Sequence, residues 1–282
     1  MDNIKKIGLA LGGGGARGLA HIGVLKVLER EKVPIAAIAG TSMGGIIGGA
    51  YASGISIQDI EKETHRVRKR RVQLRLLDLT FIGGSLLKGT RIYQYIASML
   101  GENLTFDDLR IPFAVVAVDL NTGRQVILKE GKVVDAVRAT MSVPGVFEPV
   151  RSGSLRLVDG GILNNVPVDV ARSLGAEVVI AVDVLPHFTP NMPGEPPLVH
   201  PLKLPYTPEA IQELMHVEFV MISELTEYRL CQAQPDLVLR PVLPVEMSLF
   251  IGFDRAEDAV QAGEAATEEA LPRIKELVQA ID

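Results

Sequence analysis

Tryptophan is absent from this chain of 282 residues, aromatic residues make up only 5% of it, and there is a single cysteine, Cys231. One cysteine excludes an intramolecular disulfide and a cysteine-based metal site within the chain, so we expect a reducing, cytoplasmic setting. Because aromatic residues are few, the core must be built mainly from Ile, Val, Leu, Ala and Met, as is typical of buried parallel sheets. A formal net charge of −5 does not indicate a nucleic-acid-binding protein.

Long apolar runs are also missing. No stretch of about 18 apolar residues predicts a transmembrane helix, and the N-terminus lacks the basic and apolar regions of a signal peptide. The chain is nevertheless 47% hydrophobic and 22% charged, which is enough to bury a sizeable core and is not typical of disordered chains. The composition predicts no oligomeric state.

Strand and helix patterns alternate along the first half, which predicts parallel βαβ units and an α/β fold. Apolar runs predict strands at residues 4–11, 33–40, 113–119, 124–129, 155–158, 177–184 and 236–240. Helical patterns are found at residues 16–31, 43–53, 57–70, 89–100, 132–141, 166–174, 208–232 and 254–280. Between them, residues 186–208 contain eight prolines and predict an extended loop. This loop is either a surface excursion or a lid.

A candidate nucleophile lies in the sequence GTSMG, where Gly40, Ser42 and Gly44 form a G-x-S-x-G pattern. The pattern follows a predicted strand and opens a predicted helix, which is the setting of a nucleophile elbow. Such a turn exposes the serine oxygen above the sheet, and the following helix N-terminus favours negative charge. The alternative is a tight turn in which Ser42 only caps the helix.

A nucleophilic serine needs a base. None of the histidines after Ser42 follows a strand at a clear turn, so a histidine-based triad has little support. Three aspartates end predicted strands instead: Asp119, Asp159 and Asp183. Asp159 precedes two glycines, which would let the chain turn and present the carboxylate at the carboxyl edge of the sheet, where open parallel sheets bind ligands. Asp119 and Asp183 are alternatives that could equally be turn formers.

The run of glycines that begins at Gly12 has two readings. A G-x-G-x-x-G pattern suits a dinucleotide phosphate, but no carboxylate ends the second strand, as a dinucleotide site requires. The other reading is an oxyanion hole, in which the backbone amides of Gly13, Gly14 and Gly15 donate to a substrate oxygen. Arg17 would then steer an anionic group, or only brace the loop.

These motifs together resemble the patatin-like phospholipase family. The sequence GGGARG from Gly13 to Gly18 matches the family's oxyanion motif, GTSMG its nucleophile motif, and Asp159 with the two following glycines its D-G-[GA] motif. Residues 139–150 also resemble the family's stretch ahead of that aspartate. The resemblance implies a three-layer α/β/α fold with a mostly parallel sheet, and one hydrolase domain over residues 1–282.

The resemblance further implies hydrolysis of lipid acyl esters by a dyad of Ser42 and Asp159, with Gly13, Gly14, Gly15 and Arg17 at the oxyanion and substrate site, and with no metal or cofactor. A lipid or acyl ester would be the substrate. The alternative is a regulatory or lipid-binding module of the same fold with little turnover. Residues 66–75 carry six cations, which predict either peripheral contact with a membrane or a solvated helix end.

Overall fold

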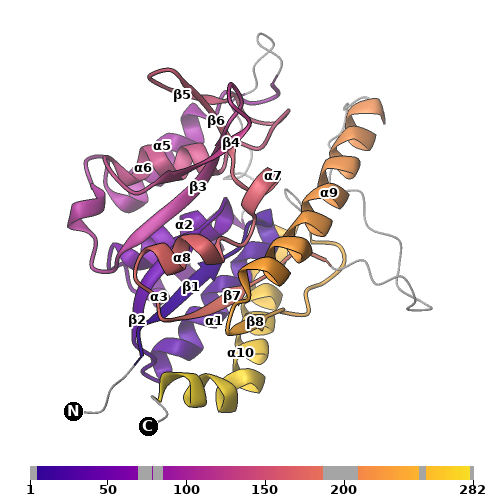
Figure 1. Ribbon diagram of the computed structural model, residues 1–282. Coiled ribbons are helices and arrows are strands. Elements are labelled where there is room, and N and C mark those ends of the chain that lie inside the picture. Colours follow the sequence, from indigo (N-terminus) through magenta and orange to yellow (C-terminus); the bar gives the residue numbers. More distant parts are fainter. Residues whose placement is uncertain (1–4, 69–77, 79–84, 187–208, 248–251, 280–282) are drawn as a thin grey trace.

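Eight strands form one mixed sheet in the part of the chain that the structure describes. The structure, a computed structural model, describes residues 5–68, 78, 85–186, 209–247 and 252–279 (Figure 1). The strands are β1 (Ile7–Leu11), β2 (Ile35–Gly40), β3 (Phe113–Asp119), β4 (Arg124–Leu128), β5 (Val150–Ser152), β6 (Leu155–Asp159), β7 (Val178–Val182) and β8 (Leu237–Leu239). Their order is β5-β6-β3-β2-β1-β7-β8, with β4 paired to β3. The central strands β3, β2, β1, β7 and β8 are parallel, β4 and β6 pair antiparallel with β3, and β5 pairs antiparallel with β6.

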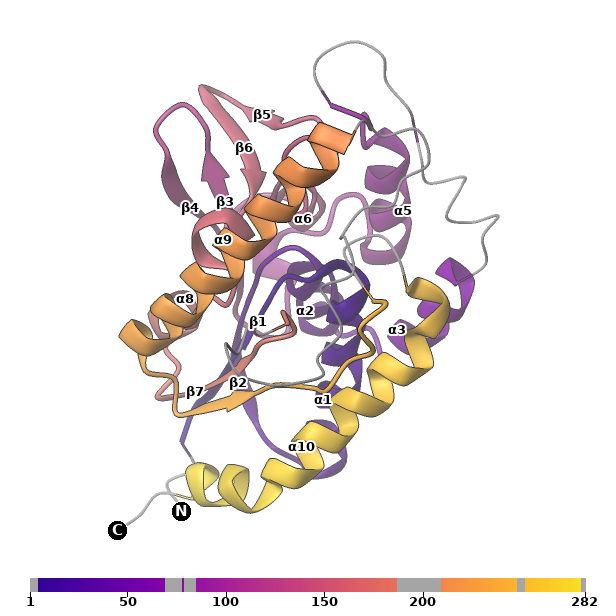
Figure 2. The same ribbon diagram turned by 90° about the vertical axis from the view of Figure 1, so that its right-hand side faces the viewer.

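Helices cover both faces of this sheet (Figures 1 and 2). They are α1 (Ala20–Arg30), α2 (Met43–Ala52), α3 (Ile57–Val67), α5 (Thr90–Leu100), α6 (Val133–Thr140), α7 (Gly161–Asn164), α8 (Val168–Ser173), α9 (Glu209–Ala233) and α10 (Ala256–Val278). Short 3-10 turns lie at Gly15–Leu19, Phe106–Asp108 and Phe253–Arg255. The predicted three-layer α/β/α fold with a mostly parallel sheet is therefore confirmed.

The predicted elements are all present, with a few shifts at their ends. The helix predicted from residue 16 begins as a 3-10 turn and becomes α-helical at Ala20. The elements β5 and α7 were not predicted, because three or four residues are too few to show a period. Pro272 lies inside α10 without ending it. The predicted proline-rich loop, apart from residue 186, lies outside the described residues.

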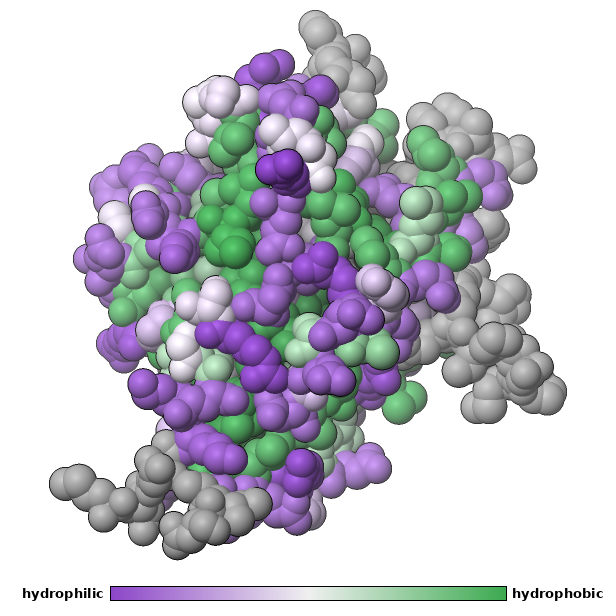
Figure 3. Space-filling view, in the orientation of Figure 1, coloured by the Kyte–Doolittle hydropathy of each residue, from purple (hydrophilic) through white to green (hydrophobic). Residues whose placement is uncertain are grey.

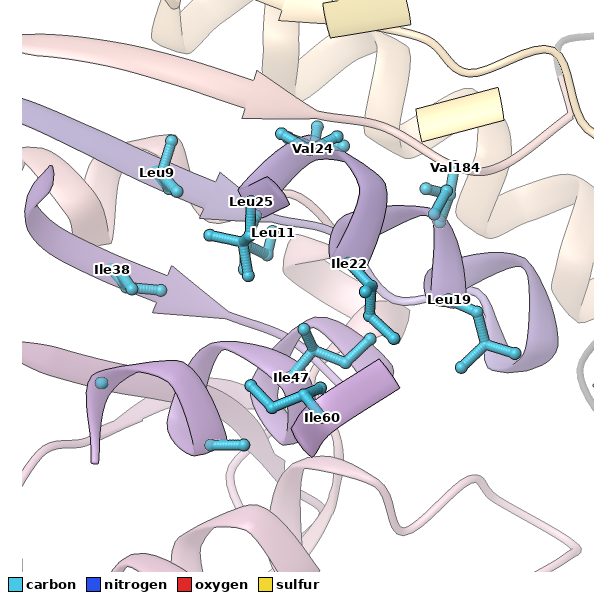
Figure 4. Close-up of a cluster of buried hydrophobic side chains, with 14 of the residues drawn as sticks. Leu9, Leu11, Leu19, Ile22, Val24, Leu25, Ile38, Ile47, Ile60 and Val184 are labelled. Carbon is cyan, nitrogen blue, oxygen red and sulfur yellow. The ribbon is translucent and has the colours of Figure 1, made fainter. Parts of the chain in front are cut away.

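The two faces of the sheet differ in side-chain size. In β1, Leu9 and Leu11 point into the larger core, which Figure 4 shows packed against residues of α1 and α2, and Ala10 points to the opposite face. On that opposite face α8 and the turn after it come close, since a Cβ added at Gly8 would lie 3.6 Å from the Cβ of Ala171 in α8 and 2.4 Å from that of Ala176 in the turn. Larger side chains thus fill the space under α1, α2 and α10, and smaller ones let α8 approach the strands.

The C-terminal helix α10 packs directly on α1 through two glycines. A Cβ added at Gly23 would lie 1.9 Å from the carbonyl oxygen of Val260, and one added at Gly263 would lie 2.0 Å from that of Ala20. The two helix backbones are therefore in contact, and a side chain at either glycine would force them apart. Lys26 of α1 also forms an ion pair with Glu264 of α10.

The strand β6 joins the sheet in a way that positions the site. Gly40, the last residue of β2, pairs with Val115 of β3, whereas Asp159, the last residue of β6, pairs with Ala117. Because β4 occupies the other edge of β3, β2 and β6 lie on the same side of β3 and run towards each other. Their carboxyl ends therefore meet end to end. We expected Asp159 to follow a strand ending at the common parallel edge, but β6 arrives antiparallel.

Candidate active site

Ser42 occupies a strained turn between β2 and α2. Its φ is 52° and its ψ is −119°, a conformation that residues other than glycine rarely adopt and that costs on the order of 1–3 kcal/mol. The neighbouring glycines are required by close approach, since a Cβ at Gly44 would lie 2.1 Å from the carbonyl oxygen of Leu11. The Ser42 side chain makes no capping hydrogen bond to α2, so the alternative that it only caps the helix is wrong.

Thr140 holds this turn from the end of α6. The backbone N–H of Ser42 donates to Oγ1 of Thr140 at 3.0 Å, and that hydroxyl donates in turn to the carbonyl of Val116 in β3. Thr140 is fully buried. Since the threonine hydroxyl uses both its donor and an acceptor position, it fixes the nucleophile turn to the middle of the sheet without taking part in the cleft.

Asp159 lies opposite Ser42 at the end of β6. Its backbone N–H donates to the carbonyl of Ser142 at 2.9 Å, and its Oδ1 accepts from the N–H of Gly161 at 2.8 Å. Burial raises the pKa of Asp159 to about 6, although hydrogen bonds from Gly161 and from the Ser42 side chain partly offset this. Ser42 and Asp159 are therefore brought together in one cleft, as the predicted dyad requires.

The other two strand-ending aspartates lie elsewhere. Asp119 accepts hydrogen bonds from the N–H groups of Asn121 and Arg156 and from the hydroxyl of Thr122, so it forms a turn. Asp183 accepts from the N–H of Leu185 at 3.1 Å. Neither residue lines the cleft that contains Ser42.

The glycine loop lies beside Ser42, but its amides are not equivalent. The N–H of Gly13 donates to the carbonyl of Asn165 at 3.3 Å, and Nδ2 of Asn165 donates to the carbonyl of Gly13 at 3.2 Å. The amide of Gly13, expected at the oxyanion site, is therefore already engaged. The amides of Gly14 and Gly15 donate to no carbonyl of the described chain, which makes them the better candidates for an oxyanion hole.

Arg17 points into the protein behind the loop. It is buried, and its Nε donates to the carbonyl of Val184 at 2.6 Å while Nη1 reaches the carbonyls of Pro244 and Met247. Burial lowers the pKa of Arg17 to about 10, and the charge of Asp183 partly offsets this. These contacts favour the bracing alternative over contact with an anionic group of a substrate.

His21 also supports the loop from behind. Its Nε2 lies 2.7 Å from the carbonyl of Gly12, to which it donates, since only that tautomer completes the bond. Complete burial lowers the pKa of His21 to about 4, so the ring is neutral.

The cleft itself is mostly apolar. Its lining comprises Gly13, Gly14, Ser42, Val143, Pro144, Asp159, Gly161, Ile162, Asn165, Leu185, Glu218, Phe219 and Ile222. The last three come from α9, the long orange helix of Figure 2. An apolar cleft with a hydroxyl and a carboxylate at its base suits an acyl chain whose ester lies beside Ser42.

Several residues of the site were not predicted: Thr140, Ser142, Asn165 and Glu218. The first two fall in the stretch 139–150, whose resemblance to a family motif was a usable signal. Asn165 follows the Asp159 turn in the sequence DGGILNN, and a polar residue so close to a glycine turn was a weaker signal. Glu218 gave none, because a glutamate on a long helix is most often solvated.

The cations predicted to meet a membrane lie mostly outside the described residues. Of residues 66–75, the structure describes residues 66–68. Arg66 pairs with Glu63 at 3.1 Å, and Arg68 pairs with Glu257 at 2.8 Å. These two arginines are therefore engaged with carboxylates of the protein itself.

The arrangement defines a class: an α/β/α protein with a serine at a strained strand-to-helix turn, a buried carboxylate facing it and a glycine loop alongside. Comparison with known proteins agrees. Residues 9–172 match the family model described as patatin-like phospholipase. The chain therefore belongs to the patatin-like phospholipase family.

Individual relatives are much longer than this chain. It is 40% identical over 185 residues to a patatin-like phospholipase domain-containing protein of Caenorhabditis elegans, covering 63% of this chain and 13% of that protein. It is 31% identical over 275 residues to the neuropathy target esterase of Drosophila melanogaster, covering 90% and 19%. An uncharacterised NTE family protein of Mycobacterium bovis is 35% identical over 181 residues, covering 64% and 49%.

Among solved structures, VipD from Legionella pneumophila is similar with a TM-score of 0.50 at 13% identity, covering 96% of this chain and 67% of that one. At this identity the likeness concerns the fold alone.

Proposed function

We propose that this protein is a serine lipid acyl hydrolase of the phospholipase A, lysophospholipase or esterase type. The observation that carries the proposal is the meeting of Ser42, on its strained turn, with the buried carboxylate of Asp159 in one apolar cleft. Family membership and the esterase name of a relative support the reaction class.

The chemistry follows from the two side chains. Oγ of Ser42 attacks the acyl carbonyl while Asp159 accepts the proton of the Ser42 hydroxyl. The tetrahedral intermediate then expels the alcohol, which takes up that proton from Asp159. Water then attacks the acyl-serine. Asp159 accepts a proton from this water and returns it to Oγ of Ser42 as the second tetrahedral intermediate collapses, which releases the carboxylic acid and restores both side chains. A pKa near 6 suits this role, because the carboxylate is largely ionised at neutral pH yet more basic than an ordinary aspartate.

The negative oxygen of the intermediate needs donors. The amides of Gly14 and Gly15 support this proposal, because they make no other hydrogen bond to described residues. Donors placed in this way lower the barrier by about 3–4 kcal/mol each. Arg17 would act indirectly, by fixing the loop that carries these amides.

The decisive experiment replaces the nucleophile. Ser42→Ala should reduce turnover of acyl esters by about three orders of magnitude or more while the protein stays folded. A fluorophosphonate probe should label the wild type at Ser42 and leave the variant unlabelled. A folded variant with undiminished turnover, or a wild type that neither turns over esters nor is labelled, would instead favour a lipid-binding module.

We infer peripheral contact with a lipid surface from a face of α9. Leu214, Val217 and Met221 are 68%, 52% and 66% exposed, and their spacing places them on one side of the helix. Figure 3 shows apolar residues gathered there. The same helix lines the cleft, so a lipid surface on this face would lie beside its entrance. Replacing Met221 with Asp should weaken co-sedimentation with phosphatidylcholine vesicles, whereas an exposed control, Val242→Asp, should not.

No helix among the described residues is long and apolar enough to cross a bilayer. We also propose that residues 1–282 form one domain. The backbone contact between α1 and α10 supports this, because it joins the C-terminal helix to the N-terminal half of the chain.

A further inference from the structure

We propose that Glu218 makes the cleft selective for acyl esters whose leaving group is uncharged, so that neutral glycerolipid esters are better substrates than anionic phosphate-bearing ones. This inference rests on the proposed hydrolase function. It assigns Glu218 as a specificity-determining residue and leaves the chemical step to Ser42 and Asp159.

The first support is the position of Glu218. It lies on α9, is half-buried, and lines the same cleft as Ser42 and Asp159. Its neighbours in the lining from the same helix, Phe219 and Ile222, are apolar. A carboxylate among such neighbours is poorly solvated, so its charge acts strongly on any group that enters the cleft.

The second support is the balance of charge in the cleft. Among the described lining residues, Asp159 and Glu218 carry carboxylates and none is basic. The nearby cation Arg17 is buried against carbonyl groups and interacts with Asp183 instead. Arg229, further along α9, pairs with Asp169. A phosphate group beside the scissile ester would therefore meet two carboxylates and no cation of the described lining.

The third support is the ionisation of Glu218. Burial and the charge of Asp159 raise its pKa to about 7. Both carboxylates line the same cleft, so the negative charge of Asp159 opposes ionisation of Glu218. Above pH 7 most of the Glu218 side chains are ionised, so discrimination by charge is best measured at pH 8.

The test compares two esters that differ only in the leaving group. Octanoyl-glycerol and octanoyl-glycerol phosphate are offered at pH 8, below the concentration at which they form micelles, and the ratio of their kcat/KM values is measured. The wild type should favour the neutral ester by about tenfold or more, as expected for a phosphate group, mostly a dianion at pH 8, that is repelled at short range in a partly buried site.

Variants then assign this ratio to Glu218. Glu218→Gln should reduce the preference by about fivefold or more, and Glu218→Lys should reduce it further or reverse it. Glu224→Gln is the matched control, because it removes an exposed carboxylate of the same helix that does not line the cleft. It should keep both the activity and the ratio of the wild type.

Two outcomes would overturn the inference. One is a wild type that prefers the phosphate ester. The other is a Glu218→Gln variant with the wild-type ratio. Calorimetry on the Ser42→Ala variant, with ether analogues of the two esters, tests the same selectivity without turnover. Because this measurement needs no turnover, it distinguishes a failure of the proposed selectivity from a failure of the proposed hydrolase function.

Discussion

Two aspartates end neighbouring strands of the same sheet, and their pKa values are shifted in opposite directions. Asp119 ends β3 and Asp159 ends β6, and the two strands are paired directly, Asp119 with Leu157 and Ala117 with Asp159. Both side chains are buried. Hydrogen bonds, first among them the one from the Arg156 amide, lower the pKa of Asp119, whereas burial raises that of Asp159 to about 6.

Beside the larger desolvation of Asp159, the two turns differ in the donors that they supply to the carboxylate. Asp119 receives two backbone amides and the Thr122 hydroxyl, which together satisfy the carboxylate. Asp159 receives one backbone amide, from Gly161, and the Ser42 hydroxyl. An incompletely satisfied carboxylate remains basic, so the same residue type at the same kind of position is a turn former in one case and a candidate base in the other.

The largest expected effect separates the two aspartates by activity. Asp159→Asn should lower kcat/KM for a neutral acyl ester by about 10²–10⁴-fold, because the base that accepts the Ser42 proton is lost. Asp119→Asn should stay within about threefold of the wild type. Initial rates on folded protein, checked by circular dichroism, decide this. Equal losses in both variants would contradict the assignment of Asp159 as the base.

The second expected effect is on the pH dependence of turnover. Asp159 must be ionised to accept a proton, and its pKa is about 6. Below that pH, kcat/KM should fall about tenfold per pH unit. Asp119→Asn should show the same profile. A wild-type profile that stays flat from pH 7 down to pH 4 would show that the acting base is not a carboxylate with this raised pKa.

The smallest expected effect is on stability, and it has opposite signs at the two sites. Because the pKa of Asp159 is higher in the folded protein than the ordinary 3.8, wild-type stability falls as pH rises from about 4 to 6. Asp159→Asn should therefore be more stable at pH 8 by about 3 kcal/mol, which corresponds to a pKa raised from 3.8 to about 6, with the gain vanishing near pH 4. Urea unfolding at both pH values measures this.

Asp119 should behave in the reverse way. Its lowered pKa contributes stability that is present above its ordinary pKa and is lost as pH falls. Asp119→Asn should therefore lower the urea midpoint at pH 8 and make less difference in acid. If the two variants shift the midpoint at pH 8 in the same direction, the contrast in donors does not explain their electrostatics.

Much of the fold could be predicted because its signals are local. The apolar run that ends at Leu11 and the glycines after it predict a buried strand and a turn without knowledge of any partner. The same holds for the G-x-S-x-G turn at Ser42, since only small residues fit there. The direction of β6 could not be predicted in this way, because pairing with β3 depends on residues far apart in the sequence.

The functional site, too, could be predicted only where its signals are local. Local patterns pointed to Ser42, Asp159 and the glycine loop as candidates. They did not predict that the Gly13 amide is engaged by Asn165, that Arg17 faces inward, or that Glu218 enters the cleft from α9. The first two depend on contacts between residues more than 150 positions apart, and the third brings Glu218 near Asp159, which lies 59 positions earlier in the sequence.

The sequence by itself determined the family, the strand-and-helix order and the turn chemistry, because glycine, serine and apolar periodicity act on their immediate neighbours. Only the tertiary structure decided in which direction the pKa of each aspartate is shifted and which amides have acceptors. These properties depend on burial and on the donors that distant segments provide, and a pattern of nearby residues cannot specify either.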